Sequence, residues 1–209
     1  PLGHQRVELP GPEGGNPIDR IAADYFKKNR IQSPAAISDA RFLRRVSLDL
    51  VGLLPSKSEL ETFVASDLGA KREAKIKQIL TRDLDYADHW MTFWNDLLRN
   101  DYAGTGFIDG GRRQITGWLY LSLKENKPYD QFVFEQIAGD TCGADEATGF
   151  LVAGPKDIVG GKDPLLRKQQ RPNELADMVG VTGSAFLGLT VGCARCHDHK
   201  FDPVSQSDF

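Results

Sequence analysis

The chain has 209 residues, of which 40% are hydrophobic, and its 26 Lys and Arg nearly balance 29 Asp and Glu, for a net charge of -3. This is enough apolar material to bury one sizeable core or two small ones, and the interspersed charges exclude a nucleic-acid footprint and a basic membrane-binding face. No apolar run approaches the length of a membrane span, and three cysteines are too few for a disulfide scaffold.

The first 15 residues predict no folded element. Pro1-Leu2-Gly3-His4 resembles a vector remnant, and the Pro- and Gly-rich stretch up to Gly15 is typical of a linker. We therefore expect residues 1–15 to be a tag remnant and flexible linker, and residues 16–209 to form one domain.

From residue 16 on, apolar residues recur at helical spacing. Asn16-Pro17 is a helix opening with Asn as the cap, Ser38 can cap a second helix, and Ser56 with Glu59 forms a capping box for a third. The pattern predicts helices at about residues 16–26, 38–51, 58–66, 71–80, 86–99, 112–125, 129–138 and 172–189, the last one opening at Pro172.

Two segments stand out from this pattern. The helix at 86–99 carries an aromatic stripe, which at this spacing is more often core than cofactor pocket and which His89 and Met91 border. Residues 139–164 contain six glycines and two prolines without a sustained period, and predict a long ordered loop. The expected fold is mainly α, one domain of seven to eight helices with long Gly-rich loops.

The most specific motif follows the last predicted helix. Cys193-Ala194-Arg195-Cys196-His197 is the Cys-x-x-Cys-His pattern by which haem is attached covalently in c-type cytochromes. Two thiols three positions apart on a helical turn can reach the two vinyl groups of the porphyrin, and the next residue presents an imidazole to the iron. The pattern predicts haem c, with His197 as the proximal ligand, at the C-terminal end of the last helix.

Two alternatives stay open for the same residues. Cys193 and Cys196 could form a disulfide, or they could hold zinc together with His197 and His199. Zinc usually takes its ligands as two separated pairs, so a closed site within seven residues would need a very tight loop. Cys142 is expected to be a free thiol in a loop.

Three long motifs resemble a known family. The stretches at 42–55, 128–140 and 186–203 are similar to the second of the planctomycete cytochrome-c-like domains, a domain of unknown function. The likeness covers roughly residues 16 to 209. It implies a cytochrome-like helical domain within a larger exported protein, beside neighbouring domains and in connection with polysaccharide breakdown. The family often has a His in the aromatic helix where Phe93 stands here.

If haem is bound, the residues near the motif have predictable roles. Arg195 and Lys200 could pair with the propionates or remain solvated. Asp198 and Asp202 could fix the tautomer of a neighbouring His. His199 is expected to hydrogen-bond locally, with a metal as the alternative. His89 and Met91 are the candidate distal ligands.

The motif also predicts where the protein works, because bacteria attach haem covalently outside the cytoplasmic membrane. We expect an exported, periplasmic or cell-surface redox module that serves a redox partner or a neighbouring catalytic domain. The alternative is a helical structural or carbohydrate-associated domain without haem. An independent enzyme is less favoured, because no pair of carboxylates is apparent among Glu135, Asp140, Asp109 and Asp101.

Overall fold

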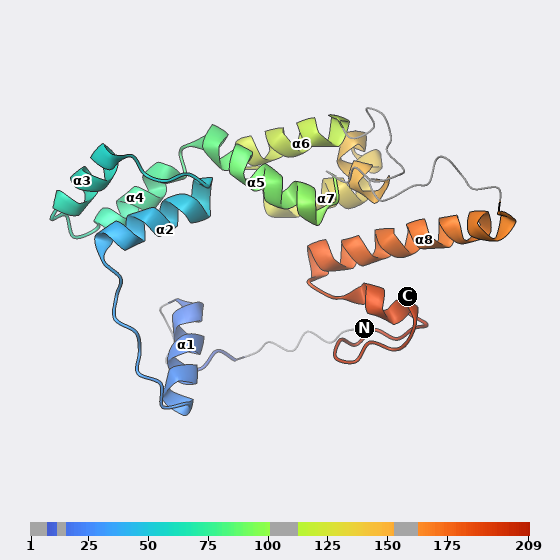
Figure 1. Cartoon of the computed structure of the whole chain (residues 1–209), viewed down its shortest axis with the longest axis horizontal. Helices are drawn as coiled ribbons and strands as arrows, with labels where there is room; N and C mark the ends of the chain where they lie inside the picture. Colours follow the sequence, from blue (N-terminus) through green and yellow to red (C-terminus); the bar gives the residue numbers. More distant parts are fainter. Residues whose placement is uncertain (1–7, 12–15, 101–112, 153–162) are drawn as a thin grey trace.

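The computed structural model of the chain describes residues 8–11, 16–100, 113–152 and 163–209. These residues form eight α-helices joined by turns, and none of them forms a strand, so the predicted mainly α fold is confirmed (Figure 1). The helices are α1 (Pro17–Lys28), α2 (Asp39–Val51), α3 (Lys57–Ala65), α4 (Lys71–Ile79), α5 (Asp83–Leu97), α6 (Arg113–Lys124), α7 (Tyr129–Ala138) and α8 (Pro164–Thr182). Within the described ranges, no helix is both long and apolar enough to cross a membrane.

The N-terminal helices begin where the sequence predicts them. The side chains of Asn16, Ser38 and Ser56 each accept a hydrogen bond from a backbone N–H in the first turn of α1, α2 and α3. Such caps satisfy donors that a helix start leaves without partners. Gly52 ends α2 in the left-handed conformation, with φ of 68°, which glycine adopts without strain.

Helices α2, α3 and α4 enclose one apolar cluster, built from Leu43, Val51, Phe63 and Ile79. Asp39 at the start of α2 accepts hydrogen bonds or ion pairs from Lys71 and Arg72 of α4. Figure 1 shows these helices together at one end of the molecule, with α5 leading from them to α6 and α7. A second apolar region lies there, centred on Leu98, Ile115, Phe132 and Phe150.

Part of the predicted loop at 139–164 is helical and buried. It contains two 3-10 helices, η1 (Gly139–Thr141) and η2 (Asp145–Val152), and Ala147 and Phe150 of η2 are fully buried. The expectation of an irregular loop was wrong here because two apolar side chains are enough to anchor a 3-10 segment that has no long period. The rest of that stretch, 153–162, lies outside the described residues, as do Asp101 and Asp109.

The last helix begins earlier than predicted. Asp163 caps it through a hydrogen bond from the Leu165 N–H, and Pro172, expected at its first position, lies inside it. A proline inside a helix leaves one carbonyl without its donor. Pro172 lies in an exposed stretch, where water can satisfy that carbonyl.

Candidate cofactor site

A break in the chain separates the cysteine motif from the last helix. After α8 the backbone makes a π-helical turn, η3 (Gly183–Leu187), reverses at Gly188 with φ of 64°, and enters a 3-10 helix, η4 (Val191–Arg195). The motif therefore lies in its own turn beyond the helix end, and the predicted continuation of the last helix to residue 189 was wrong, because α8 ends at Thr182.

Gly183 fixes this turn against α8. A Cβ placed on Gly183 would lie 2.4 Å from Val191 Cγ2, so only glycine allows Val191 to approach this closely. The Leu189 N–H donates to the Gly183 carbonyl over 3.2 Å. The close approach of Val191 to the Gly183 backbone thus positions η4. The apolar residues whose spacing predicts the last helix contribute less to this contact, since Leu175 and Val179 are exposed.

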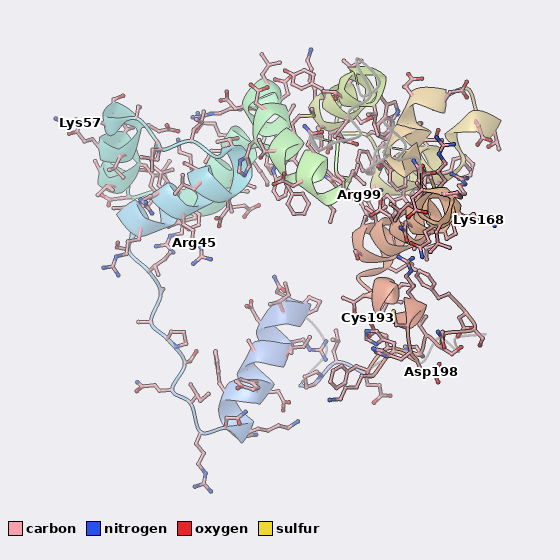
Figure 2. The ribbon with its side chains drawn as sticks, turned by 45° about the vertical axis from the view of Figure 1, so that its right-hand side comes forward. Arg45, Lys57, Arg99, Lys168, Cys193 and Asp198 are labelled. Atoms are coloured by element: carbon pink, nitrogen blue, oxygen red, sulfur yellow. The ribbon has the colours of Figure 1, made fainter. Side chains whose placement is uncertain are left out.

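The two thiols of the motif are free and exposed. The Cys196 N–H donates to the Cys193 carbonyl over 3.5 Å, which closes a 3-10 turn between them. Figure 2 shows Cys193 on the turn beneath α8, with Asp198 in the following loop. No backbone has to open before a reagent can reach these thiols.

His197 has one ring nitrogen engaged and one available. Its Nδ1 lies 2.8 Å from the Asp198 carbonyl oxygen, which can only accept, so Nδ1 carries the hydrogen and donates. The lone pair is then on Nε2 of an exposed ring. A backbone partner on Nδ1 is the arrangement that orients a metal-binding His. The predicted partner was the Asp198 carboxylate, which instead accepts from the Gln206 N–H.

His199 has both ring nitrogens occupied. Its Nδ1 accepts from the Asp202 N–H at 2.7 Å, so the hydrogen is on Nε2, which lies 2.7 Å from Thr190 Oγ1 and 3.5 Å from an Asp202 carboxylate oxygen. The side chain is only 8% exposed. These bonds connect the loop after the motif to the residue before η4, and they leave no lone pair of His199 for a metal.

The two basic residues beside the motif have partners within the chain. Arg195 donates to the Asn173 side chain of α8, and the Lys200 ammonium lies 5.2 Å from the centre of the Phe201 ring. Arg195 thereby adds a second link between η4 and α8.

The structure places the other candidate ligands on different elements. Cys142 follows η1 and its thiol donates weakly to the Gly139 carbonyl. His89 and Met91 are on α5, where the His89 ring packs against Gly52 and Met91 packs on the cluster of Trp118 and Phe132. η4, in contrast, contacts α8 and η3.

Within the described ranges, no group of three or more His, Cys, Asp or Glu side chains is arranged to hold a metal ion. The zinc alternative therefore has no preformed ligand set in that part of the chain. Covalent haem needs less from the protein: two accessible thiols on one turn and one imidazole with a lone pair on Nε2. The residues of the 193–197 turn fit that requirement.

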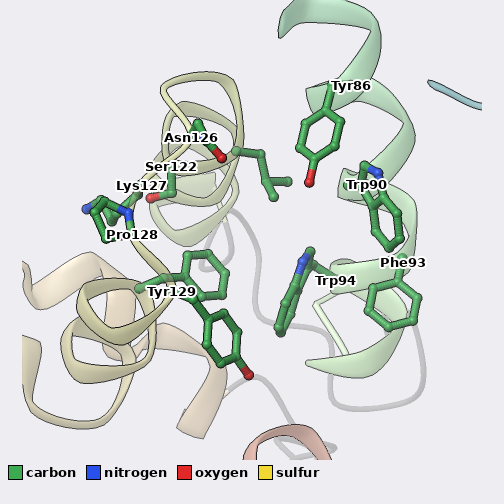
Figure 3. Close-up of a pocket in the computed structure, with 11 residues that line it drawn as sticks. Tyr86, Trp90, Phe93, Trp94, Ser122, Asn126, Lys127, Pro128 and Tyr129 are labelled. Carbon is green, nitrogen blue, oxygen red and sulfur yellow. The ribbon is translucent and has the colours of Figure 1, made fainter. Parts of the chain in front are cut away.

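The aromatic stripe of α5 packs on the core in part, through Tyr86 and Trp94, and also lines a pocket. A cavity of about 460 Å³ lies between α5 and the turn from α6 to α7 (Figure 3), and its aromatic walls are Tyr86, Trp90, Phe93, Trp94, Tyr129 and Phe132. The expectation of a core stripe was wrong for Phe93, which is 50% exposed. The helical spacing identified the aromatic face of α5 but not the residues that lie opposite it. Those residues form the second wall of the pocket and lie more than 20 positions further along the chain.

A buried carboxylate supports that second wall. Glu135 of α7 accepts hydrogen bonds from Trp118 Nε1 and the Gln131 amide at 2.8 Å each, and it pairs with the Lys127 ammonium. Burial by itself raises the pKa of the Glu135 carboxyl, but these donors and the Lys127 charge outweigh it and hold the pKa below its usual value. Glu135 therefore works as an ionised support that fixes Lys127 and the α6–α7 turn.

Residues 17–209 match the family described as PSCyt2, protein of unknown function (DUF1549). No curated protein and no solved structure matches the chain. The match covers nearly the whole chain, and the chain therefore belongs to this family of unknown function.

Proposed function

We propose that this member of the PSCyt2 family is a c-type haem-binding domain that serves as an electron-transfer or redox module of a larger exported protein. The observation that carries the proposal is the state of the 193–197 turn: two free, exposed thiols and a His197 ring with its lone pair on Nε2. When bound, the haem would supply a one-electron carrier.

The chain's own residues would divide the work of holding it. The thiols of Cys193 and Cys196 would form the thioether links, and His197 would bind the iron, with its orientation fixed by the Asp198 carbonyl. His89 and Met91 have other packing partners on α5, so we expect the sixth position to be open. Replacing His89 and Met91 separately should leave the oxidised and reduced spectra unchanged.

Arg195 and Lys200 remain the candidate partners for the propionates. To reach them, Arg195 would exchange the Asn173 side chain for a carboxylate, a stronger partner for a guanidinium. The electron would pass to a redox partner or to a neighbouring catalytic domain of the same protein, outside the cytoplasm and in connection with polysaccharide breakdown.

The test is to produce the chain with an export signal beside a cytochrome c maturation system and to record the reduced pyridine haemochrome spectrum. A c-type band that survives acid-acetone extraction supports the proposal. The Cys193→Ser/Cys196→Ser double variant should lose the band, whereas Cys142→Ser, which alters the third exposed cysteine, should keep it. A colourless protein overturns the proposal.

One observation favours a second function, a helical structural or carbohydrate-associated domain without haem. The segment that carries the motif is held together by bonds among its own residues, those of His199, Thr190 and Asp202, which would suit a structural role. If the protein is colourless, metal analysis would separate a zinc site from free thiols or a disulfide.

A further inference from the structure

The aromatic pocket between α5 and the α6–α7 turn runs from an exposed rim to a buried floor. At the rim, Tyr129 is 60% exposed, whereas at the floor Phe132 is 4% exposed. A volume of about 460 Å³ is within the usual range for small-molecule sites. The depth favours a small ligand over a flat contact between proteins.

Several polar side chains of the pocket lining have no hydrogen-bond partner in the described part of the chain, among them Ser122, Tyr86, Asn126 and Tyr129. The Ser122 hydroxyl is buried and unpaired, with the residue 3% exposed. Figure 3 shows the Tyr86 hydroxyl and the Asn126 side chain directed toward the space between the two walls. The Ser122 oxygen itself has almost no exposed surface, so a ligand in the pocket would meet the Tyr86 and Asn126 groups instead.

The pocket's charge is already balanced. Lys127 lines the wall, but its ammonium is paired with the Glu135 carboxylate and lies 4.9 Å from the centre of the Trp118 ring. An anionic ligand would have to compete with Glu135 for that cation, so the pocket favours a neutral molecule.

We propose that this pocket binds a neutral, planar aromatic ring that carries one or two oxygen substituents, a ligand of the phenol class. The ring would stack among Tyr86, Trp94 and Tyr129, since aromatic groups favour offset or edge-to-face contacts. Its oxygen would hydrogen-bond to the Asn126 amide or to the Tyr86 hydroxyl. A sugar ring fits less well, because most of the lining is aromatic carbon, and burying hydroxyl groups that find no partner there is costly. The proposal does not depend on haem.

The experiment is isothermal titration calorimetry of the whole chain with 2-naphthol as the probe, beside 2-naphthoate and methyl glucoside. We expect 2-naphthol to bind, and to bind at least tenfold more tightly than either of the others. Tighter binding of the naphthoate or the glucoside would overturn the ligand class. No measurable binding of any of the three would overturn the pocket itself.

The variants separate binding from folding. Tyr129→Ala should weaken binding about tenfold, whereas Phe134→Ala, an equally exposed aromatic on the same helix but outside the pocket, should not change it. Asn126 has φ of 50°, so Asn126→Gly keeps the turn and removes only the amide. Ser122→Ala should leave the melting temperature equal or higher. Asn126→Gly should weaken 2-naphthol binding several-fold, whereas Ser122→Ala, whose hydroxyl the pocket does not expose, should leave the affinity nearly unchanged. Unchanged affinity in Asn126→Gly would contradict the proposed contact.

Discussion

The cysteine turn and the aromatic pocket are built in opposite ways. The turn is held by bonds between near neighbours in the sequence, such as those of His199 with Thr190 and Asp202, plus two contacts with α8. The pocket is made by two walls far apart in the chain, and a buried ion pair fixes one of them. The first site is visible as a motif, and the second exists only once the chain has folded.

The turn and the pocket also differ in how far their side chains contribute to the stability of the fold. The thiols of the turn are exposed and unbridged, so we expect the stability of the haem-free protein to depend little on them. In the pocket the same side chains pack the fold and line the cavity: Trp94 contacts Phe132 in the core and also faces the space that a ligand would fill. Substitutions should therefore affect stability strongly at the pocket and weakly at the thiols.

The largest effect is expected at Glu135. Glu135→Gln removes the charge that pairs with Lys127, whose side chain is mostly buried, and should lower the free energy of unfolding by about 2–3 kcal/mol. Glu125→Gln makes the same charge change at an exposed position nearby and should have little effect. Chemical denaturation of both variants measures the difference. Equal stability of the two variants would show that the ion pair does not support the pocket wall.

The same pair predicts a pH dependence. The pKa of the Glu135 carboxyl is lower in the folded chain than its usual value of 4.5, so its contribution is present above about pH 4.5 and is lost as the pH falls through the folded-state pKa. The stability difference between the wild type and Glu135→Gln should therefore shrink as the solution is acidified below pH 4.5. A difference that stayed constant down to pH 2 would contradict this assignment.

Next in size is the contact that holds the cysteine turn to α8. Gly183→Ala places a methyl group against Val191 and should cost about 1–3 kcal/mol. Gly180→Ala, in the preceding helix α8 with open space around it, should instead stabilise the protein by about 0.5–1 kcal/mol. The Gly183→Ala/Val191→Ala double variant should recover most of the loss. Thermal unfolding tests all three, and no recovery would mean that the clash lies elsewhere.

Sequence patterns predicted the helices and caps well where one face is buried and a polar side chain can accept from the first turn, as at Ser38 and Ser56. They failed where the deciding contact is distant. Proline is common at the first position of a helix, so the sequence predicted a helix start at Pro172. In the structure Asp163 caps α8 earlier in the chain, and Pro172 lies inside the helix. Likewise, the pocket needs Tyr129 opposite Trp94, and no periodicity within one helix can predict that pairing. At the candidate site, the sequence singled out the Cys and His residues of the motif but not the break at Gly188 that places them outside the helix.

The two histidines of the motif segment should differ clearly in haem-free protein. His199→Ala removes the acceptor for the Asp202 N–H and the bond to Thr190, and should cost about 1–2 kcal/mol. His197→Ala loses only one exposed bond to a neighbouring carbonyl and should stay within about 0.5 kcal/mol of the wild type. Hydrogen exchange at the amides of residues 199–206 should be faster in His199→Ala alone. Faster exchange in His197→Ala would show that both rings support the loop.

The smallest effect on stability is expected at Cys193 and Cys196, the two residues proposed to hold the haem. Cys193 and Cys196 are exposed, make no disulfide and close their turn through backbone atoms, so Cys193→Ser/Cys196→Ser in haem-free protein should change the free energy of unfolding by less than about 0.5 kcal/mol. The same substitution in protein matured with haem should abolish attachment. Loss of more than about 1 kcal/mol in the haem-free protein would mean that the thiols support the fold through a bridge or a metal, and the redox assignment would then give way to a structural one.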